Sequence, residues 1–139
     1  MAVVVQKFGG TSVADPERIK AVAEHVAFTR RHGNDVVVVV SAMGKTTDNL
    51  ISLANQVSSV HPGRELDMLL TTGERISMAL VCMALAGLGI DAVSFTGSQV
   101  GIITDTVHTK AKILEVKGDR LREALSAGKV AVVAGFQGV

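Results

Sequence analysis

The sequence predicts an α/β domain built on a mainly parallel central sheet. Apolar, β-branched segments alternate along the chain with segments whose apolar residues recur at helical spacing, and this alternation is typical of layered α/β proteins. Residues 3–5 and 36–40 are all valine, which is the pattern of strands that helices cover on both faces. A polar, glycine-containing segment follows each strand. We therefore expect a ligand site at the carboxyl ends of these strands, where open α/β sheets bind ligands.

The composition suits this fold and argues against several classes of partner. The 139 residues are 47% hydrophobic and only 3% aromatic, so aliphatic side chains must build the core. Fourteen Lys and Arg against thirteen Asp and Glu give a net charge of +1, which does not favour nucleic acid or an anionic membrane as a partner. Cys82 is the only cysteine, and its apolar surroundings predict a core residue in a reducing compartment. No signal segment or membrane-length apolar run is evident, so we expect a cytoplasmic protein.

The first half of the chain predicts two strands and three helices. Asp15 is the expected N-cap of the first helix, with Pro16 at its first position and Gly33 after its end. The strand at 36–40 follows, and a second helix carries Leu50, Leu53, Ala54 and Val57 on one face. Residues 61–63, His-Pro-Gly, should end that helix. An apolar segment at 66–70 and a polar one at 71–75 then precede a third helix, expected from Ile76 to Gly87.

The second half predicts two further parallel strands with a hairpin between them. Residues 91–95 should form a strand and 96–98 a turn, and the short strand that begins at Ile102 could pair with its neighbour as a hairpin. Residues 110–116 look extended, and a helix should run from Gly118 to Gly128. Residues 130–136 should form a last buried strand. Because a buried strand is a poor place for a domain to stop, we expect the fold to continue beyond residue 139 and 130–136 to leave an exposed apolar edge.

Lys7, Gly9 and Gly10 form the first candidate site. Two glycines at the end of a strand let backbone N–H groups approach an anion closely, and a lysine beside them adds positive charge. The alternative is an ordinary tight turn between strand and helix. Lys7 favours phosphate binding, because a lysine at the end of so apolar a strand needs a reason to be there.

Residues 41–48, Ser-Ala-Met-Gly-Lys-Thr-Thr-Asp, form the second candidate site. The polar groups are those of Ser41, Lys45, Thr46 and Thr47. They lie near an expected helix N-terminus, which is a good place to bind an anion. A P-loop is excluded, because its first glycine would have to stand at Val39. In the alternative interpretation, a side chain of residues 46–48 only caps the helix.

Glu74 is the third candidate. Residues 71–74 read Thr-Thr-Gly-Glu, which has the spacing of a capping box, and Glu74 would then only bond the backbone of Thr71. In the functional interpretation, Glu74 binds the ammonium group of a substrate. The four histidines, His25, His32, His61 and His108, have no partner at metal-ligand spacing, so we expect no metal site in the protein.

Taken together, these motifs strongly resemble the aspartate kinases, which belong to the amino acid kinase superfamily. The resemblance rests on residues 7–12 (KFGGTS), 38–48 (VVVSAMGKTTD), 70–74 (LTTGE), 94–99 (SFTGSQ) and 134–138 (AGFQG). It covers nearly the whole chain and implies a three-layer α/β/α sandwich. It also implies transfer of the ATP γ-phosphoryl group to the β-carboxylate of L-aspartate, which gives 4-phospho-L-aspartate and begins lysine, threonine and methionine synthesis.

The resemblance also implies roles for individual residues. Lys7 is the expected catalytic residue, and it should hold the transferring phosphoryl group together with Phe8, Gly9, Gly10 and Ser41. Thr47 and Glu74 should bind aspartate, Glu74 at the α-ammonium. Mg²⁺ is expected to bridge the ATP phosphates. The longer enzyme of which this chain would form a part is expected to be a homo-oligomer or to pair with a partner chain.

Residues 1–139 correspond to the N-terminal portion of the family's catalytic domain. The family continues into a Gly-Arg-Gly-Gly-Ser-Asp segment, the nucleotide base site and regulatory ACT domains, none of which is in this sequence. This chain alone is therefore expected to be inactive. Two alternatives stay open: a kinase for another small acid, such as acetylglutamate, or a non-catalytic binding or assembly module of the same fold.

Overall fold

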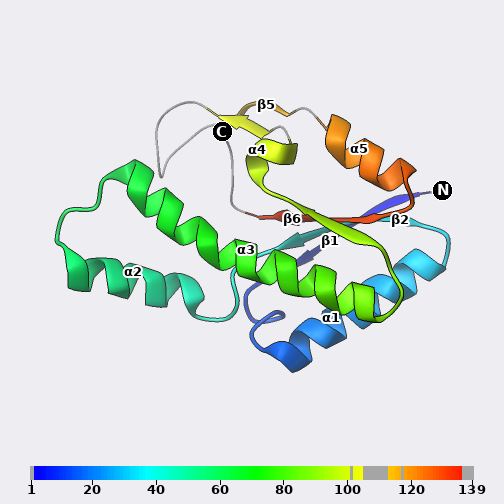
Figure 1. Cartoon of the computed structure of the whole chain (residues 1–139), viewed down its shortest axis with the longest axis horizontal. Helices are drawn as coiled ribbons and strands as arrows, with labels where there is room; N and C mark the ends of the chain where they lie inside the picture. The colour runs from blue at the N-terminus through cyan, green and yellow to red at the C-terminus, as the bar shows by residue number, and fades with distance from the viewer. Residues whose placement is uncertain (1, 101, 105–112, 117, 136–139) are drawn as a thin grey trace.

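The structure, a computed structural model, describes residues 2–100, 102–104, 113–116 and 118–135. Its elements are β1 (Val3–Phe8), α1 (Pro16–Arg31), β2 (Asp35–Val40), α2 (Thr46–Val57), α3 (Gly63–Gly87), β3 (Ala92–Phe95), α4 (Gly97–Val100), β4 (Ile102–Thr104), β5 (Ile113–Val116), α5 (Asp119–Ser126) and β6 (Val130–Ala134). Strand and helix alternate as expected (Figure 1). The predicted α/β fold class is confirmed.

Four parallel strands form the main sheet in the order β1-β2-β6-β3, and β4 and β5 pair separately as an antiparallel ribbon. The valine strand β2 lies inside the sheet between β1 and β6, as its sequence predicts. All strands of the main sheet point the same way, so their carboxyl ends share one edge. The loops after β1 and β2 therefore start side by side.

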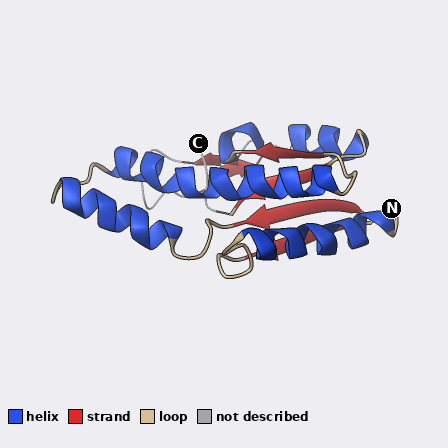
Figure 2. Cartoon of the chain, turned by 60° about the horizontal axis from the view of Figure 1, so that its bottom comes forward, coloured by secondary structure: helices blue, strands red, loops and turns tan. Residues whose placement is uncertain are grey.

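The main core lies between the sheet and helices α1 and α3. Val36, Val38 and Val40 of β2 and Val130 and Val132 of β6 point into it. The helices contribute Ile19, Val22, Ala23, Val26, Met78, Val81 and Leu85, all of them nearly or fully buried. Burying an aliphatic side chain of this size is worth about 1.5–3 kcal/mol. Helices α4 and α5 contact β6 from the other face, so helices lie on both sides of the sheet (Figure 2).

The expectation that β1 is buried on both faces is wrong. Its residues alternate between exposed and half-buried, with Val3 57% and Val5 64% exposed. The strand lies at the edge of the described sheet and pairs only with β2. One face is covered by α1, where Gln6 Nε2 donates to Thr29 Oγ1 at 2.8 Å. A run of valines therefore predicted the strand but not which of its faces is covered.

The interpretation of residues 66–75 as separate segments is also wrong, because they lie within one long helix, α3. The threonine hydroxyls donate to carbonyl oxygens of the preceding turn, Thr71 to Met68 at 3.0 Å and Thr72 to Leu69 at 2.6 Å. These local bonds satisfy the polar groups inside the helix. By length and composition alone, α3 could cross a membrane. Its buried residues, however, pack on the sheet as those of a core helix do.

Most predicted helix ends are confirmed. Asp15 caps α1, with its Oδ1 accepting from Arg18 N at 2.8 Å, and Pro16 stands at the first position. Gly33 and Gly128 follow α1 and α5 with φ of 86° and 80°, values that favour glycine. The turn expected at 96–98 is different, because α4 begins at Gly97.

The predicted last strand is present, but it is not an exposed edge. β6 pairs with β2 on one side and β3 on the other, so 130–134 are central. Residues 136–139 lie outside the described part of the chain, and so do 105–112, into which the extended segment expected at 110–116 partly falls.

Candidate functional site

Two loops meet at the carboxyl edge of the sheet. The amide N–H of Gly44 donates to Gly10 O at 2.9 Å, which ties the loop after β2 to the glycine turn after β1. A Cβ atom on Gly10 would lie 2.9 Å from Ala42 O and 3.1 Å from Gly44 O. No side chain fits between these backbone atoms, so glycine is required at this position. The glycine pair of the first candidate site therefore packs directly on the second candidate site.

The sheet itself holds the start of the second loop. Ser41 N donates to Phe8 O at 3.3 Å, and Gly135 N donates to Val40 O at 2.9 Å. The backbone on both sides of the β2 end is thus bonded to a neighbouring strand. Ser41 is half-buried and Thr47 is exposed in the first turn of α2.

Helix α3 crosses the same loop at Gly73. A Cβ atom there would lie 3.0 Å from Ala42 Cβ and 3.1 Å from Thr46 Cγ2. The helix is therefore seated closely against residues 42–46. We call the residues that meet here, 9–10, 41–46 and 73–74, the carboxyl-edge cluster.

Glu74 is the buried acidic residue of this cluster, with 7% of its surface exposed. The capping-box interpretation of Glu74 is wrong, because α3 begins at Gly63 and Glu74 lies far inside the helix. Glu74 directly follows Gly73, the residue at which α3 approaches the loop. A buried carboxylate is costly unless a positive group or hydrogen bonds compensate it.

Lys7 reaches the edge from the opposite face of the sheet. It is exposed, and its Cα partner in β2 is Val39, whose side chain shares its face. Phe8, the next residue, packs against the core under α1 and meets the ring of His25 edge-on, with 6.0 Å between the ring centroids. Lys7 and Glu74 therefore lie on the two sides of the glycine turn, and not side by side.

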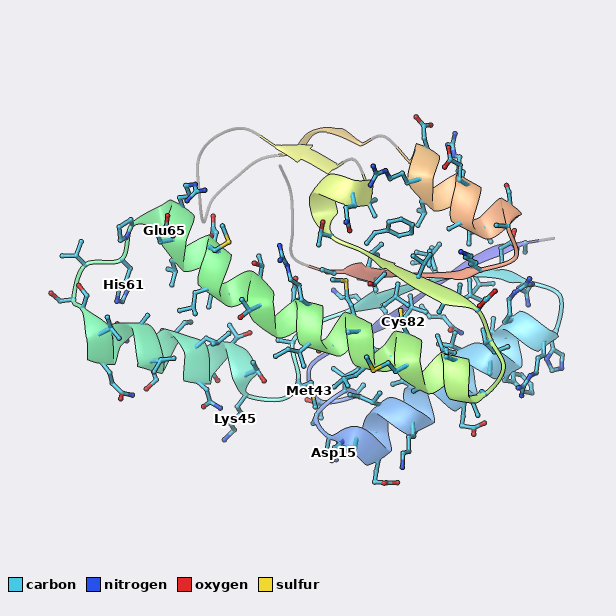
Figure 3. The ribbon with its side chains drawn as sticks, viewed as in Figure 1. Asp15, Met43, Lys45, His61, Glu65 and Cys82 are labelled. Atoms are coloured by element: carbon cyan, nitrogen blue, oxygen red, sulfur yellow. The ribbon has the colours of Figure 1, made fainter. Side chains whose placement is uncertain are left out.

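The interpretation of residues 46–48 as a helix cap is wrong. Lys45 is the N-cap of α2 and makes no side-chain capping bond, while Thr46, Thr47 and Asp48 lie in the first turn. Lys45 points into solvent at the start of α2 (Figure 3). The hydroxyls of Thr46 and Thr47 are thus not used as caps.

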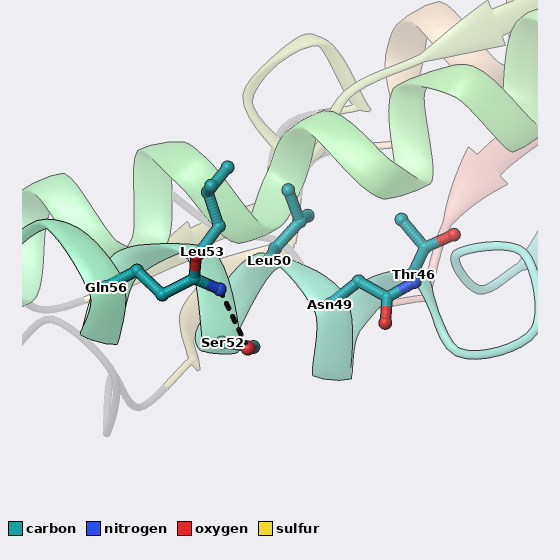
Figure 4. A pocket seen from close by; sticks show the side chains of 6 residues that line it. All are labelled: Thr46, Asn49, Leu50, Ser52, Leu53 and Gln56. Atoms are coloured by element: carbon teal, nitrogen blue, oxygen red, sulfur yellow. Dashed lines mark hydrogen bonds between the residues drawn. The ribbon is translucent and has the colours of Figure 1, made fainter.

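A shallow groove runs along α2 beyond this cluster (Figure 4). Its lining residues are Thr46, Asn49, Leu50, Ser52, Leu53 and Gln56. Gln56 Nε2 donates to Ser52 Oγ at 3.3 Å. The groove holds no charged side chain, and only Thr46 belongs to the carboxyl-edge cluster. We therefore place the candidate site at the cluster and not in the groove.

The sequence did not reveal the contact that Arg18 makes with the glycine turn. Its Nη1 donates to Thr11 O at 2.7 Å, and its Nε lies 3.8 Å from Asp15 Oδ2. Ser12 N also donates to Gly9 O at 3.0 Å, which closes the turn. Nothing in the spacing of residues 11 and 18 signals this bond, because its geometry depends on the path of the turn between β1 and α1.

The other titratable residues that the structure describes point to no second site. Burial raises the pKa of the Cys82 thiol to about 11, and a hydrogen bond with Ser94 lowers it only in part. The thiol is therefore protonated at neutral pH and is a poor nucleophile. Within the described ranges, no three His, Cys, Asp or Glu side chains gather as metal ligands would.

Residues 2–139 match the amino acid kinase family. The chain belongs to this family. Among its relatives are the aspartokinase of Mycolicibacterium smegmatis, 63% identical over 139 residues, and that of Corynebacterium glutamicum, 59% identical over 139 residues. All of this chain is matched in both cases, but only 33% of each relative. The chain thus spans about a third of the length of these aspartokinases.

Solved structures of amino acid kinases have the same fold. The aspartate kinase from Synechocystis superposes with a TM-score of 0.84 at 52% identity, over 100% of this chain and 22% of that one. Aspartokinase III of E. coli, solved with aspartate and ADP, superposes with a TM-score of 0.78 at 21% identity, over 98% of this chain and 41% of that one. The second likeness shows the fold alone. The resemblance drawn from the motifs is confirmed.

Proposed function

We propose that this chain supplies the aspartate and phosphate sites of an ATP-dependent kinase that converts L-aspartate to 4-phospho-L-aspartate. The observation that carries the proposal is the carboxyl-edge cluster, in which α3 packs at Gly73 against the loop at 42–46 and carries the buried Glu74 as its next residue. The identity of 63% with an aspartokinase over all 139 residues supports the same substrates. E. coli aspartokinase III was solved with aspartate and ADP.

The chemistry asks more for positioning than for a base. The β-carboxylate of aspartate, whose pKa is ordinarily about 3.9, is already ionised at neutral pH. Two anions must instead be aligned and the charge between them neutralised. In our proposal, Lys7 and the amides of Gly9 and Gly10 bind the transferring phosphoryl group, next to Phe8 and Ser41.

Aspartate then lies on the α3 side of the turn. Glu74 binds its α-ammonium, because opposite charges make strong hydrogen bonds. The hydroxyl of Thr47, exposed in the first turn of α2, binds a carboxylate oxygen with help from the helix N-terminus. Acceptor and phosphoryl donor thus approach each other across the edge of the sheet.

Mg²⁺ enters this proposal with ATP, bound to its phosphates, and neutralises part of their charge. The described residues gather no set of three acidic, histidine or cysteine ligands, so they fit a protein-held metal poorly. No step depends on one. From the resemblance to the aspartate kinases we also propose that the complete enzyme is cytoplasmic and acts in lysine, threonine and methionine synthesis. We propose that it works as a homo-oligomer or with a partner chain.

The experiment joins residues 1–139 to the remaining two-thirds of the Mycolicibacterium smegmatis aspartokinase, which gives a complete enzyme. We expect it to phosphorylate L-aspartate, detected as aspartyl hydroxamate, and to leave N-acetylglutamate unchanged. A completed enzyme that folds and binds neither aspartate nor ATP would support a non-catalytic assembly module. Phosphorylation of N-acetylglutamate alone would move the substrate assignment to that acid.

A further inference from the structure

Gly73 is unfavourable for the stability of the helix in which it lies. It lies inside α3, where glycine costs roughly 1 kcal/mol relative to alanine. Its backbone φ is not in the left-handed region that favours glycine. The conformation would therefore accept alanine, and the reason for glycine must be the space around it.

That space is already filled by the loop. A methyl group at position 73 would lie 3.0 Å from Ala42 Cβ, 3.1 Å from Thr46 Cγ2 and 3.6 Å from Leu50 Cδ1. Carbon atoms in good contact stand about 3.5–4.0 Å apart. Either α3 or the loop would have to move by a few tenths of an ångström.

The loop is the part that cannot move easily. Gly44 N is bonded to Gly10 O at 2.9 Å, and Ser41 N to Phe8 O at 3.3 Å. On its other side Ala42 O already faces Gly10, where even a Cβ would lie at 2.9 Å. A methyl at position 73 should therefore displace α3, and the carboxylate of Glu74 with it.

We propose that Gly73 is a positioning residue that sets the distance between Glu74 and the loop at 41–47. The inference rests on the proposed function, because it assigns Glu74 to aspartate. Ala42 fixes this distance, because it lies between the two glycines. A Cβ on Gly10 would meet its carbonyl oxygen, and a Cβ on Gly73 would meet its methyl group. Aspartate would be bound between Glu74 on α3 and groups on the loop, so a change in this distance misplaces the substrate.

The test compares Gly73→Ala with two other variants in the completed enzyme. Gly73→Ala should raise KM for aspartate roughly tenfold, because displacements well under 1 Å already cost much of the benefit of alignment. KM for ATP should change less than about twofold, because the groups proposed to bind phosphate, on β1, its turn and Ser41, stay in place. Gly87→Ala is the matched control, since a Cβ at Gly87, also in α3, meets nothing within 4 Å.

The double variant Ala42→Gly/Gly73→Ala moves one methyl group from the loop to the helix. It removes the contact with Ala42 Cβ and leaves the one with Thr46 Cγ2, so KM for aspartate should fall at least threefold from the value for Gly73→Ala, as expected for two residues that couple by contact. A double variant as impaired as Gly73→Ala would overturn the proposal. So would an unchanged KM in Gly73→Ala, or an equal rise for aspartate and ATP. If Gly73→Ala does not fold, the double variant decides: restored folding and KM support the proposal, and renewed unfolding contradicts it.

A crystal structure of Gly73→Ala gives a readout that does not depend on the reaction. Superposed on the main sheet, residue 74 should move away from the loop at 42–46 while Gly10 and Gly44 stay in place. An unmoved α3 overturns the proposal even if the enzyme is active. If α3 is displaced in Gly73→Ala as expected but the completed enzyme without substitutions does not use aspartate, the result would count against the proposed function alone.

Discussion

The carboxyl-edge cluster and helix α2 adjoin each other, yet they are packed in opposite ways. In the cluster, backbone approaches backbone so closely that Gly10 has no room for a side chain. Helix α2 begins at the end of the same loop and buries none of its residues. Leu53 is 52% and Val57 82% exposed, although both belong to the predicted apolar face. Figure 1 shows α2 and the first half of α3 extending beyond the sheet.

In the proposed function, this difference assigns the chemistry to the closely packed cluster. Phosphoryl transfer depends on alignment, so the groups that perform it should be held by bonds to the sheet and not by a surface helix. The spacing of apolar residues predicted α2 as clearly as α1. The apolar faces of α1 and α3 are buried in the core, whereas that of α2 is not. The following predictions contrast the cluster with α2, from the largest expected effect to the smallest.

The largest effect is expected from removing everything outside residues 1–139. With saturating ATP and Mg²⁺, the isolated chain should make no detectable 4-phospho-L-aspartate, because it spans only 33% of its aspartokinase relatives and positioning supplies most of this catalysis. A coupled assay of ADP release measures this. Mass spectrometry must exclude contaminating host enzyme, and turnover by the pure chain would contradict the prediction.

Lys7→Ala should come next. In the completed enzyme, kcat should fall by roughly 10²–10³, the usual cost of removing one group that stabilises transition-state charge. KM for aspartate should barely change, because in the proposed function Glu74 and Thr47 bind it. The control is Lys20→Ala, which removes an exposed lysine on α1 outside the cluster. Loss of kcat by only a few-fold in Lys7→Ala would make Lys7 an ordinary strand-end lysine.

Gly10→Ala should mainly affect stability. A Cβ at this position would lie 2.9 Å and 3.1 Å from two carbonyl oxygens of the backbone, so the variant should lose about 1–3 kcal/mol, as overpacked sites do. Gly9→Ala is the matched control, because a Cβ at Gly9 meets nothing within 4 Å. Urea unfolding of both variants measures the difference. Equal stability of the two would show that the loops can separate without cost.

Leu53→Ala should have the smallest effect. Leu53 is 52% exposed on the helix without buried residues, so its loss should cost less than about 1 kcal/mol, well below the 2–5 kcal/mol of a buried leucine. The KM values for ATP and aspartate should stay unchanged. Leu85→Ala on α3, fully buried at 0% exposure, is the contrast. A Leu53→Ala variant as unstable as Leu85→Ala would mean that α2 is covered in the working enzyme.

The sequence was informative where local chemistry decides the structure. Asp15 and Pro16 gave the start of α1, and the valines at 36–40 gave a central strand, because capping and β-branching act locally. Three candidate motifs came from strand ends and glycines, and the structure joins two of them through the bond from Gly44 N to Gly10 O.

The sequence was misleading where packing between residues that are far apart in sequence decides the structure. Residues 71–74 have the spacing of a helix start but lie inside α3, because that helix continues across the loop and its hydroxyls bond within it. The covered face of β1 depends on which helices dock there, and valines alone cannot show that. The close approach of Ala42 and Thr46 to Gly73 could not be predicted either, since these residues are distant from it in sequence.

The kinetics of Glu74→Gln in the completed enzyme test the central claim most directly. The substitution keeps the shape of the side chain and removes the charge that we propose binds the α-ammonium of aspartate. We expect KM for aspartate to rise by roughly 30–100-fold, since a buried charged pair that loses one partner costs 2–5 kcal/mol, while KM for ATP and the melting temperature stay nearly constant. An unchanged KM for aspartate, with a lowered melting temperature, would show instead that Glu74 serves only the packing of α3.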